Sequence, residues 1–140
     1  MQHTLAIVKP DAVAAGNAGN VLAHLEKEGF TFRGLRVVHL TAEQAGAFYA
    51  VHRDRPFYGS LVDFMTSGPC IPVALERVEA VPYLRQVMGA TNPAEADEGT
   101  IRKLYATNIE RNAIHGSDSP ENAAKELGFF FSTAELIGSR

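Results

Sequence analysis

The sequence predicts an α/β (α+β) protein, a β-α-β-β-α-β sandwich in which helices pack on one face of a four-stranded antiparallel sheet. Two observations support this fold class. Short apolar runs of strand length alternate along the chain with stretches whose apolar residues recur at helical spacing. Glycine and proline stand at the breaks between them. An open parallel sheet is the structural alternative.

Four stretches are predicted to be strands. Residues 3–8 form an apolar run that stops at a proline, which cannot continue the interior of a sheet. Residues 30–40 alternate as a long strand, but the alternation changes parity at Gly34, which predicts a bulge or bend there. Residues 71–75 alternate again, and a short apolar pair that runs into His115 completes the set.

Helices are predicted in the connections between the strands. A helical stripe covers residues 20–28, and residues 41–44 match a capping box that opens a helix through about Ala50. One or two helical turns over residues 100–105 would place Ile101 and Leu104 inward and leave Arg102 free. Two further helices before the last strand are expected near residues 61–65 and 79–88.

The last helix has clear start signals. Ser119 is a good N-cap, and Pro120 suits the first helical position, where its missing N–H costs nothing. We expect the helix to run over residues 120–127 and to stop at Gly128. The apolar residues 129–131 then read as a short extended segment, followed by a final helical turn.

Length and composition limit the possible functions. The 140 residues are predicted to form one domain, residues 1–140. A net charge of −3 argues against a general nucleic-acid binder. No run is long enough to span a membrane, no signal peptide is predicted, and the single cysteine, Cys70, fits a reducing compartment, so we expect a cytoplasmic protein.

The stretch Asn112–Asp118 carries the candidate nucleophile. His115 lies just upstream of the helix that Ser119 opens, where free N–H groups and the helix dipole favour anions. Gly116 lets the backbone approach whatever the imidazole touches. A metal-ligand role is weaker, because the five histidines are scattered without a paired spacing.

Several basic and polar residues stand at the ends of predicted elements. Three cations and two hydrogen-bonding side chains in a net-acidic chain suit a polyphosphate ligand. The spacing alone does not show that they converge. Neither a P-loop nor a Rossmann glycine motif is present. The set comprises Lys9, Arg85, Thr91, Arg102 and Asn112.

Six sequence blocks resemble the nucleoside diphosphate kinase family over essentially the whole chain. The most specific is Asn112-Ala-Ile-His-Gly-Ser-Asp118, which is similar to the family signature N-x-x-H-G-S-D. The other five lie in family order at family-like spacing. They are Val8-Lys-Pro-Asp11, Arg55-Pro-Phe57, Ser67-Gly-Pro69, Thr91-Asn-Pro93 and Gly99-Thr-Ile-Arg102.

The resemblance implies a ferredoxin-like sandwich and transfer of a γ-phosphate from a nucleoside triphosphate to a nucleoside diphosphate. His115 would be the nucleophile and transient phosphohistidine, and Glu126 would orient it through Ser117. The residues that would hold phosphates and ribose are Lys9, Arg85, Thr91, Arg102 and Asn112. Tyr49 would line the site, and Phe57 and Ile109 would lie on the two sides of the base.

The resemblance also implies Mg²⁺ as cofactor and a homo-oligomer as the working form. The metal would be held through the phosphates without a direct protein ligand, and Asp118 would approach it through a water. The strand predicted over residues 30–40 is a candidate edge for a two-fold dimer. The chain ends soon after Ile137, without the longer tail of some members, so we expect a homotetramer, with a hexamer as the alternative. No nucleic acid or membrane partner is expected.

Two other functions remain open from the residues alone. A phosphatase or phosphocarrier would use His115 in the same way but would not need an aromatic residue at position 57. A regulatory domain of the same fold would keep the site for nucleotide binding only. Nucleotide-dependent autophosphorylation followed by release to a nucleoside diphosphate separates both from a kinase.

Overall fold

The computed structural model describes residues 1–138 and has a four-stranded antiparallel sheet at its centre. The strands lie in the order β2-β3-β1-β4, which makes β2 and β4 the edges. Their bounds are β1 Gln2–Val8, β2 Thr31–Leu35, β3 Ile71–Arg77 and β4 Ile114–Gly116. The predicted strand order along the chain and the antiparallel sheet are therefore confirmed, and the open parallel alternative is wrong.

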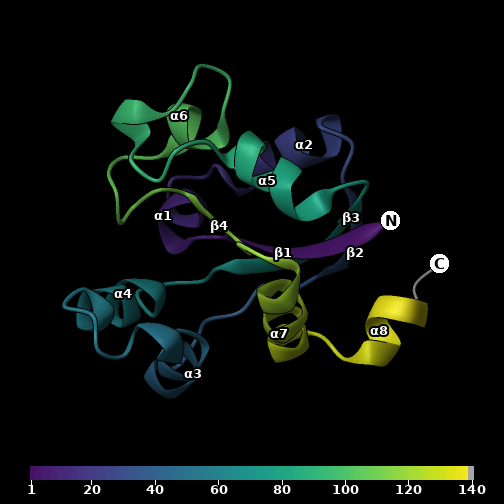
Figure 1. Ribbon diagram of the computed structural model, residues 1–140. Coiled ribbons are helices and arrows are strands. Elements are labelled where there is room, and N and C mark those ends of the chain that lie inside the picture. Colours follow the sequence, from purple (N-terminus) through teal and green to yellow (C-terminus); the bar gives the residue numbers. More distant parts are fainter. Residues whose placement is uncertain (139–140) are drawn as a thin grey trace.

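Helices cover both faces of the sheet, so the prediction that they pack on one face is wrong (Figure 1). One core lies between the sheet and α2 (Ala18–Lys27), α5 (Ala80–Met88) and α6 (Ile101–Tyr105). The other lies between the sheet and α3 (Ala42–Phe48), α4 (Tyr58–Met65) and α7 (Pro120–Phe130). The cause is in β1, where Leu5 and Ile7 enter one core while Ala6 and Val8 enter the other.

The bulge expected at Gly34 is present, but its strand is shorter than predicted. The pairing of β2 with β3 shifts register between Phe32 and Gly34, and the strand ends at Leu35. Beyond it the Arg36 N–H donates to the Pro72 carbonyl of β3 at 3.2 Å, and Val38 forms an isolated bridge with Cys70, just before β3. A Cβ at Gly34 would lie 2.8 Å from the ring of Phe131, so a small residue is needed where this ring crosses the strand.

Several helix ends follow the predicted signals. The Thr41 hydroxyl accepts from the Gln44 N–H at 3.1 Å and the Gln44 side chain accepts from the Thr41 N–H at 2.9 Å, which confirms the capping box. The Ser119 hydroxyl caps α7 by accepting from the Asn122 N–H at 3.1 Å. The short helices α1 (Pro10–Ala14), η1 (Ala50–His52) and η2 (Pro93–Glu95) were not predicted.

The end of α7 was predicted wrongly. The helix runs through Gly128 to Phe130, and only Phe131 is extended. The ring of Phe48 in α3 packs against the rings of Phe129 and Phe130, both with centroids 5.2 Å away. This tertiary packing outweighs the weak helix propensity of glycine. The last helix, α8 (Thr133–Gly138), follows at once. None of the helices described over residues 1–138 is long and apolar enough to cross a membrane.

Candidate active site

A cavity of about 720 Å³ opens beside the edge strand β4 and brings together residues that are distant in sequence. It is lined by Lys9 at the end of β1 and by residues of α3, η1, α4, α5, α6, β4 and α7 and of the segments between them. Eleven of the twelve residues singled out from the sequence line it: Lys9, Tyr49, Phe57, Arg85, Thr91, Arg102, Ile109, Asn112, His115, Asp118 and Glu126. The twelfth, Ser117, lies behind the wall and touches Glu126.

Among residues 1–138, the imidazole of His115 is held by a hydrogen bond at Nε2. Strand β4 pairs His115 with Ile7, and the following helix places Glu126 so that its Oε1 lies 2.8 Å from His115 Nε2. The Ser117 hydroxyl donates to the same oxygen at 2.8 Å. A carboxylate can only accept, so Nε2 carries the proton in the neutral ring. The lone pair is then on Nδ1, which is the nitrogen available to react.

An aromatic wall stands beside this histidine. The ring centroids of Phe48 and Tyr49 lie 5.6 and 6.3 Å from that of His115, both in edge-to-face arrangements. The Tyr49 hydroxyl is buried and has no hydrogen-bond partner within residues 1–138, and burial raises the pKa of its phenol. Phe48 was not among the residues inferred from the sequence, and only its place next to Tyr49 in the chain hinted at it.

The prediction that Arg102 is free and that Leu104 points inward is wrong. Arg102 is 5% exposed and Leu104 is 53% exposed. The guanidinium of Arg102 donates to the Gly89 carbonyl at 3.1 Å and to the Ile114 carbonyl at 2.8 Å. Ile101 is buried in the core as predicted, and Arg102 beside it faces the cavity, so this helix of five residues buries one apolar and one charged side chain.

The other two cations are also fixed by oxygen atoms that carry no full charge. Lys9 Nζ donates to Asn112 Oδ1 at 2.8 Å and to the Glu110 carbonyl at 3.3 Å. Arg85 donates to the Gly116 carbonyl at 3.2 Å. The Asn112 amide in turn donates to the Thr91 carbonyl at 3.2 Å, which joins the two sides of the cavity.

These three cations lack a carboxylate partner. In the part of the chain that the structure describes, no ion pair involves Lys9, Arg85 or Arg102. Burial, and then the charge of Arg102, lowers the pKa of Lys9 to about 8. Burial, and then the charge of Arg85, lowers the pKa of Arg102 to about 10. Lys9 and Arg102 are buried and Arg85 is exposed at the cavity wall. Such a group of like charges, without an ion pair of its own among the described residues, is suited to a multiply charged anion.

The outer end of the cavity is apolar and open. Phe57 is 47% exposed and Ile109 is 58% exposed, although both are large apolar residues. The ring of His52 lies 5.4 Å from that of Phe57. Exposed apolar side chains at a cavity mouth suit a flat, partly apolar ligand group such as a nucleobase.

Asp118 is the acidic residue on the phosphate side of the cavity. The Asn122 side chain donates to its Oδ1 at 2.6 Å, and this hydrogen bond lowers the pKa of the Asp118 carboxyl. Among residues 1–138 no three histidine, cysteine or acidic side chains gather as a metal cluster. The donor set therefore fits a metal that arrives with the ligand and meets at most one carboxylate.

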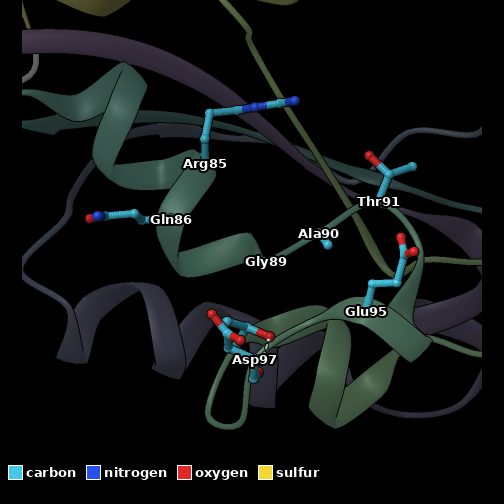
Figure 2. Close-up of a pocket in the computed structure, with 8 residues that line it drawn as sticks. Arg85, Gln86, Gly89, Ala90, Thr91, Glu95 and Asp97 are labelled. Carbon is cyan, nitrogen blue, oxygen red and sulfur yellow. Dashed lines mark hydrogen bonds between the residues drawn. The ribbon is translucent and has the colours of Figure 1, made fainter.

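A second, smaller hollow of about 390 Å³ adjoins the cavity and shares Arg85 and Thr91 with it (Figure 2). Figure 2 shows Arg85 leaving α5 toward the side on which Thr91 lies, while Gln86 points the other way. The two hollows together leave the Arg85 side chain accessible along much of its length.

Comparison with known proteins agrees with this geometry. The family model for nucleoside diphosphate kinase matches residues 2–136. The nucleoside diphosphate kinase of Chlorobium chlorochromatii is 58% identical over 139 residues, 99% of each chain, and that of Persephonella marina is 51% identical over 98% of each. An orthorhombic crystal form of the Aquifex aeolicus nucleoside diphosphate kinase superposes with a TM-score of 0.95 at 43% identity, covering 97% of this chain and 99% of that one. The chain belongs to the nucleoside diphosphate kinase family.

Proposed function

We propose that Nδ1 of His115 carries the phosphoryl group in this nucleoside diphosphate kinase, between a nucleoside triphosphate donor and a nucleoside diphosphate acceptor. The observation that supports this most directly is the hydrogen bond from Nε2 to Glu126, which leaves Nδ1 as the free nucleophile in the cavity. A neutral imidazole is a good nucleophile near pH 7. Donor and acceptor use the site in turn, so the kinetics are ping-pong.

The cations and the open apolar mouth define how the nucleotide lies. The phosphates lie among Lys9, Arg85, Thr91 and Arg102, where three cations without an ion pair among the described residues line the cavity. Asn112 contributes to the ribose end. The base stacks on Phe57 with Ile109 on its other side. No polar group need read the edge of the base, so the enzyme accepts many nucleotides.

The cations of the cavity act chiefly on the transition state. Negative charge builds up on the transferring group as the bond to the leaving oxygen breaks, and fixed donors stabilise it without reorganising. Arg102 and Arg85 are already oriented by carbonyl oxygens of β4 and the Gly89 turn. The protein thus positions the reactants and stabilises charge, while the imidazole makes the covalent bond.

A nucleotide kinase of this family uses a divalent metal, and we propose that it is Mg²⁺ bound to the phosphates. Asp118 would approach it through water, since Asn122 already fixes one of its oxygens. The metal would supply charge neutralisation on the phosphates. We also propose the cytoplasm as the compartment, with the free, buried Cys70 as support.

The test is transfer of label through the enzyme. Purified protein incubated with γ-labelled ATP should yield an acid-labile phosphoenzyme, and adding a different nucleoside diphosphate should discharge it. His115→Ala should give no label and a loss of activity of at least about 10⁴-fold, while still binding nucleotide. His24→Ala, on α2 outside the cavity, is the matched control.

Two results would contradict the proposal. Transfer by His115→Ala within tenfold of the parent would exclude the nucleophile. A phosphoenzyme that loses its phosphoryl group only to water, and not to nucleoside diphosphates, would instead favour the phosphatase or carrier function.

A further inference from the structure

The chain makes a strained turn two residues before His115. Ala113 has a φ of +73°, a value that side chains other than glycine rarely adopt. The Ile114 N–H donates to the Asn112 carbonyl at 2.8 Å, so the turn closes over a single residue. A turn of this kind with positive φ is rare and costs free energy, and it persists only where its surroundings hold it.

Two groups from the start of the chain hold this turn. The Ala113 N–H donates to Asp11 Oδ2 at 3.1 Å, and the Ala113 carbonyl accepts from the Lys9 N–H at 2.9 Å. Ala113 itself is fully buried. The first contact uses the Asp11 side chain and the second uses two backbone groups, so a substitution can remove the contact made by Asp11.

The turn orients functional groups on both of its sides. Before the turn, the Asn112 side chain accepts a hydrogen bond from Lys9 Nζ and donates one to the Thr91 carbonyl. After the turn, the Ile114 carbonyl accepts a hydrogen bond from the Arg102 guanidinium, and His115 follows in β4. A change at Ala113 would therefore move the nucleophile relative to two of the cations.

Burying the Asp11 carboxylate costs free energy of folding. Its second oxygen, Oδ1, is buried and has no hydrogen-bond partner within residues 1–138. Burial raises the pKa of this carboxyl, although the Ala113 N–H, the charge of Lys9 and the backbone N–H groups of Asp11 and Ala12 oppose the shift. A residue needed for packing alone could avoid this cost by being apolar.

We propose that Asp11 is a positioning residue for phosphoryl transfer. Through its hydrogen bond to the Ala113 N–H it fixes the strained turn and so the place of His115 relative to Arg102 and Asn112. This inference rests on the proposed role of His115, and it assigns Asp11 no contact with the nucleotide. Small displacements of a reacting group are sufficient for the effect, since about 1 Å can cost about 10²-fold in rate.

Single-turnover phosphorylation of the enzyme by γ-labelled ATP tests the proposal. Asp11→Ala should slow phosphohistidine formation by about 10- to 100-fold, and should weaken nucleotide binding by a smaller factor. Asp11→Asn keeps an acceptor oxygen but removes the charge, so it should stay within about threefold of the parent. If Asp11 acted by keeping Lys9 charged, Asp11→Asn would be as slow as Asp11→Ala.

The second test relieves the strain directly. Glycine adopts positive φ without penalty, so Ala113→Gly should hold the turn without Asp11. The double variant Asp11→Ala with Ala113→Gly should form phosphohistidine about tenfold faster than Asp11→Ala alone. Measured against Ala113→Gly alone, the double variant should then lose less than about threefold. This comparison remains usable if Asp11→Ala by itself does not fold.

Each contrary result overturns the proposal. Asp11→Ala labelled at the parent rate, Asp11→Asn as slow as Asp11→Ala, or a double variant more than tenfold slower than Ala113→Gly would exclude positioning through the turn. Failure of the His115 assignment looks different, because the parent enzyme itself would then give no phosphohistidine.

Discussion

In the proposed mechanism Glu126 determines which nitrogen of His115 reacts. Its Oε1 lies 2.8 Å from Nε2 and also accepts from the Ser117 hydroxyl at 2.8 Å, which favours the Nε2–H tautomer. Without the carboxylate, the proton distributes over both nitrogens and the ring can rotate. The role resembles that of an acidic residue that orients a catalytic histidine without taking its proton.

We therefore expect Glu126→Ala to lower kcat by about 10² or more with little change in nucleotide affinity. Ser117→Ala should lower kcat by no more than about tenfold, because the carboxylate would still accept from Nε2. Steady-state kinetics at saturating ATP provide the measurement. A Glu126→Ala enzyme with parental kcat would show that the tautomer is set by another group.

The pKa of Lys9 makes activity depend on pH. In the free enzyme this pKa lies at about 8 instead of the ordinary 10.5. We expect kcat/KM for a nucleoside diphosphate to fall as pH rises above about 8, since Lys9 then loses the charge that attracts phosphate. The pH profile of kcat should fall at higher pH, because bound phosphate stabilises the charged lysine. Identical alkaline limbs in the two profiles would argue against this role of Lys9.

The same group links stability to pH with the opposite sign. Between about pH 8 and 10.5 the unfolded chain binds more protons at Lys9 than the folded enzyme does, so this residue makes stability rise with pH across that window. Lys9→Met should remove this rise. It should also stabilise the ligand-free enzyme at pH 7 by on the order of 1 kcal/mol while weakening nucleotide binding. Denaturant unfolding at pH 7 and pH 10 would measure both effects, and an equal rise with pH in parent and variant would refute the assignment.

The sequence predicted those residues of the site that belong to a recognisable motif. The signature around His115 identified the nucleophile and, through the family resemblance, most of the cavity wall. The burial of Arg102 was missed because a helix of five residues is too short for its sequence to show which side faces the protein interior. Phe48 and Asp11 were missed because each acts through a neighbour that only the folded chain supplies.

At the level of elements, two glycines show how local propensity and packing compete. Gly128 lies inside α7, and a Cβ there would meet no atom within 4 Å. Gly34 lies in the bulge of β2, and a Cβ there would press on the Phe131 ring. Both residues are glycine, yet only one position requires it.

Alanine at these two positions should have opposite effects on stability. Gly128→Ala should raise the free energy of unfolding by about 0.5–1 kcal/mol, because alanine is the better helix former. Gly34→Ala should lower it by about 1–3 kcal/mol through overpacking. Each variant serves as the other's control in urea unfolding, and a stabilising Gly34→Ala would show that the Phe131 ring yields freely.

Elements with strong local signals were predictable, and those decided by tertiary contact were not. The capping box at Thr41 and the start of α7 need only neighbouring residues. The continuation of α7 past Gly128 depends on Phe48, which is eighty residues away in sequence. Likewise, helices on both faces follow from the burial of β1 on both sides, which a short apolar run indicates only weakly.

For the whole molecule, we expect a homotetramer. The edge strand β2 leaves backbone groups unpaired on its outer side, and the apolar residues Leu35 and Val37 near it are 44% and 66% exposed. Pairing β2 with its copy about a two-fold axis would cover both. Sedimentation equilibrium at micromolar protein should give four times the chain mass of 15.1 kDa. A species at the chain mass refutes the assembly, and one at six times that mass corrects its size.

The cavity has one His115 and one set of cations, so donor and acceptor must occupy the same place at different times. A phosphoryl group resting on the imidazole retains no trace of the nucleotide that brought it. Every triphosphate and diphosphate pair in the cell then exchanges with one common intermediate. At equilibrium the ratio of triphosphate to diphosphate becomes nearly the same for all bases. When one triphosphate is depleted, phosphoryl groups from the other triphosphates replenish it through this intermediate.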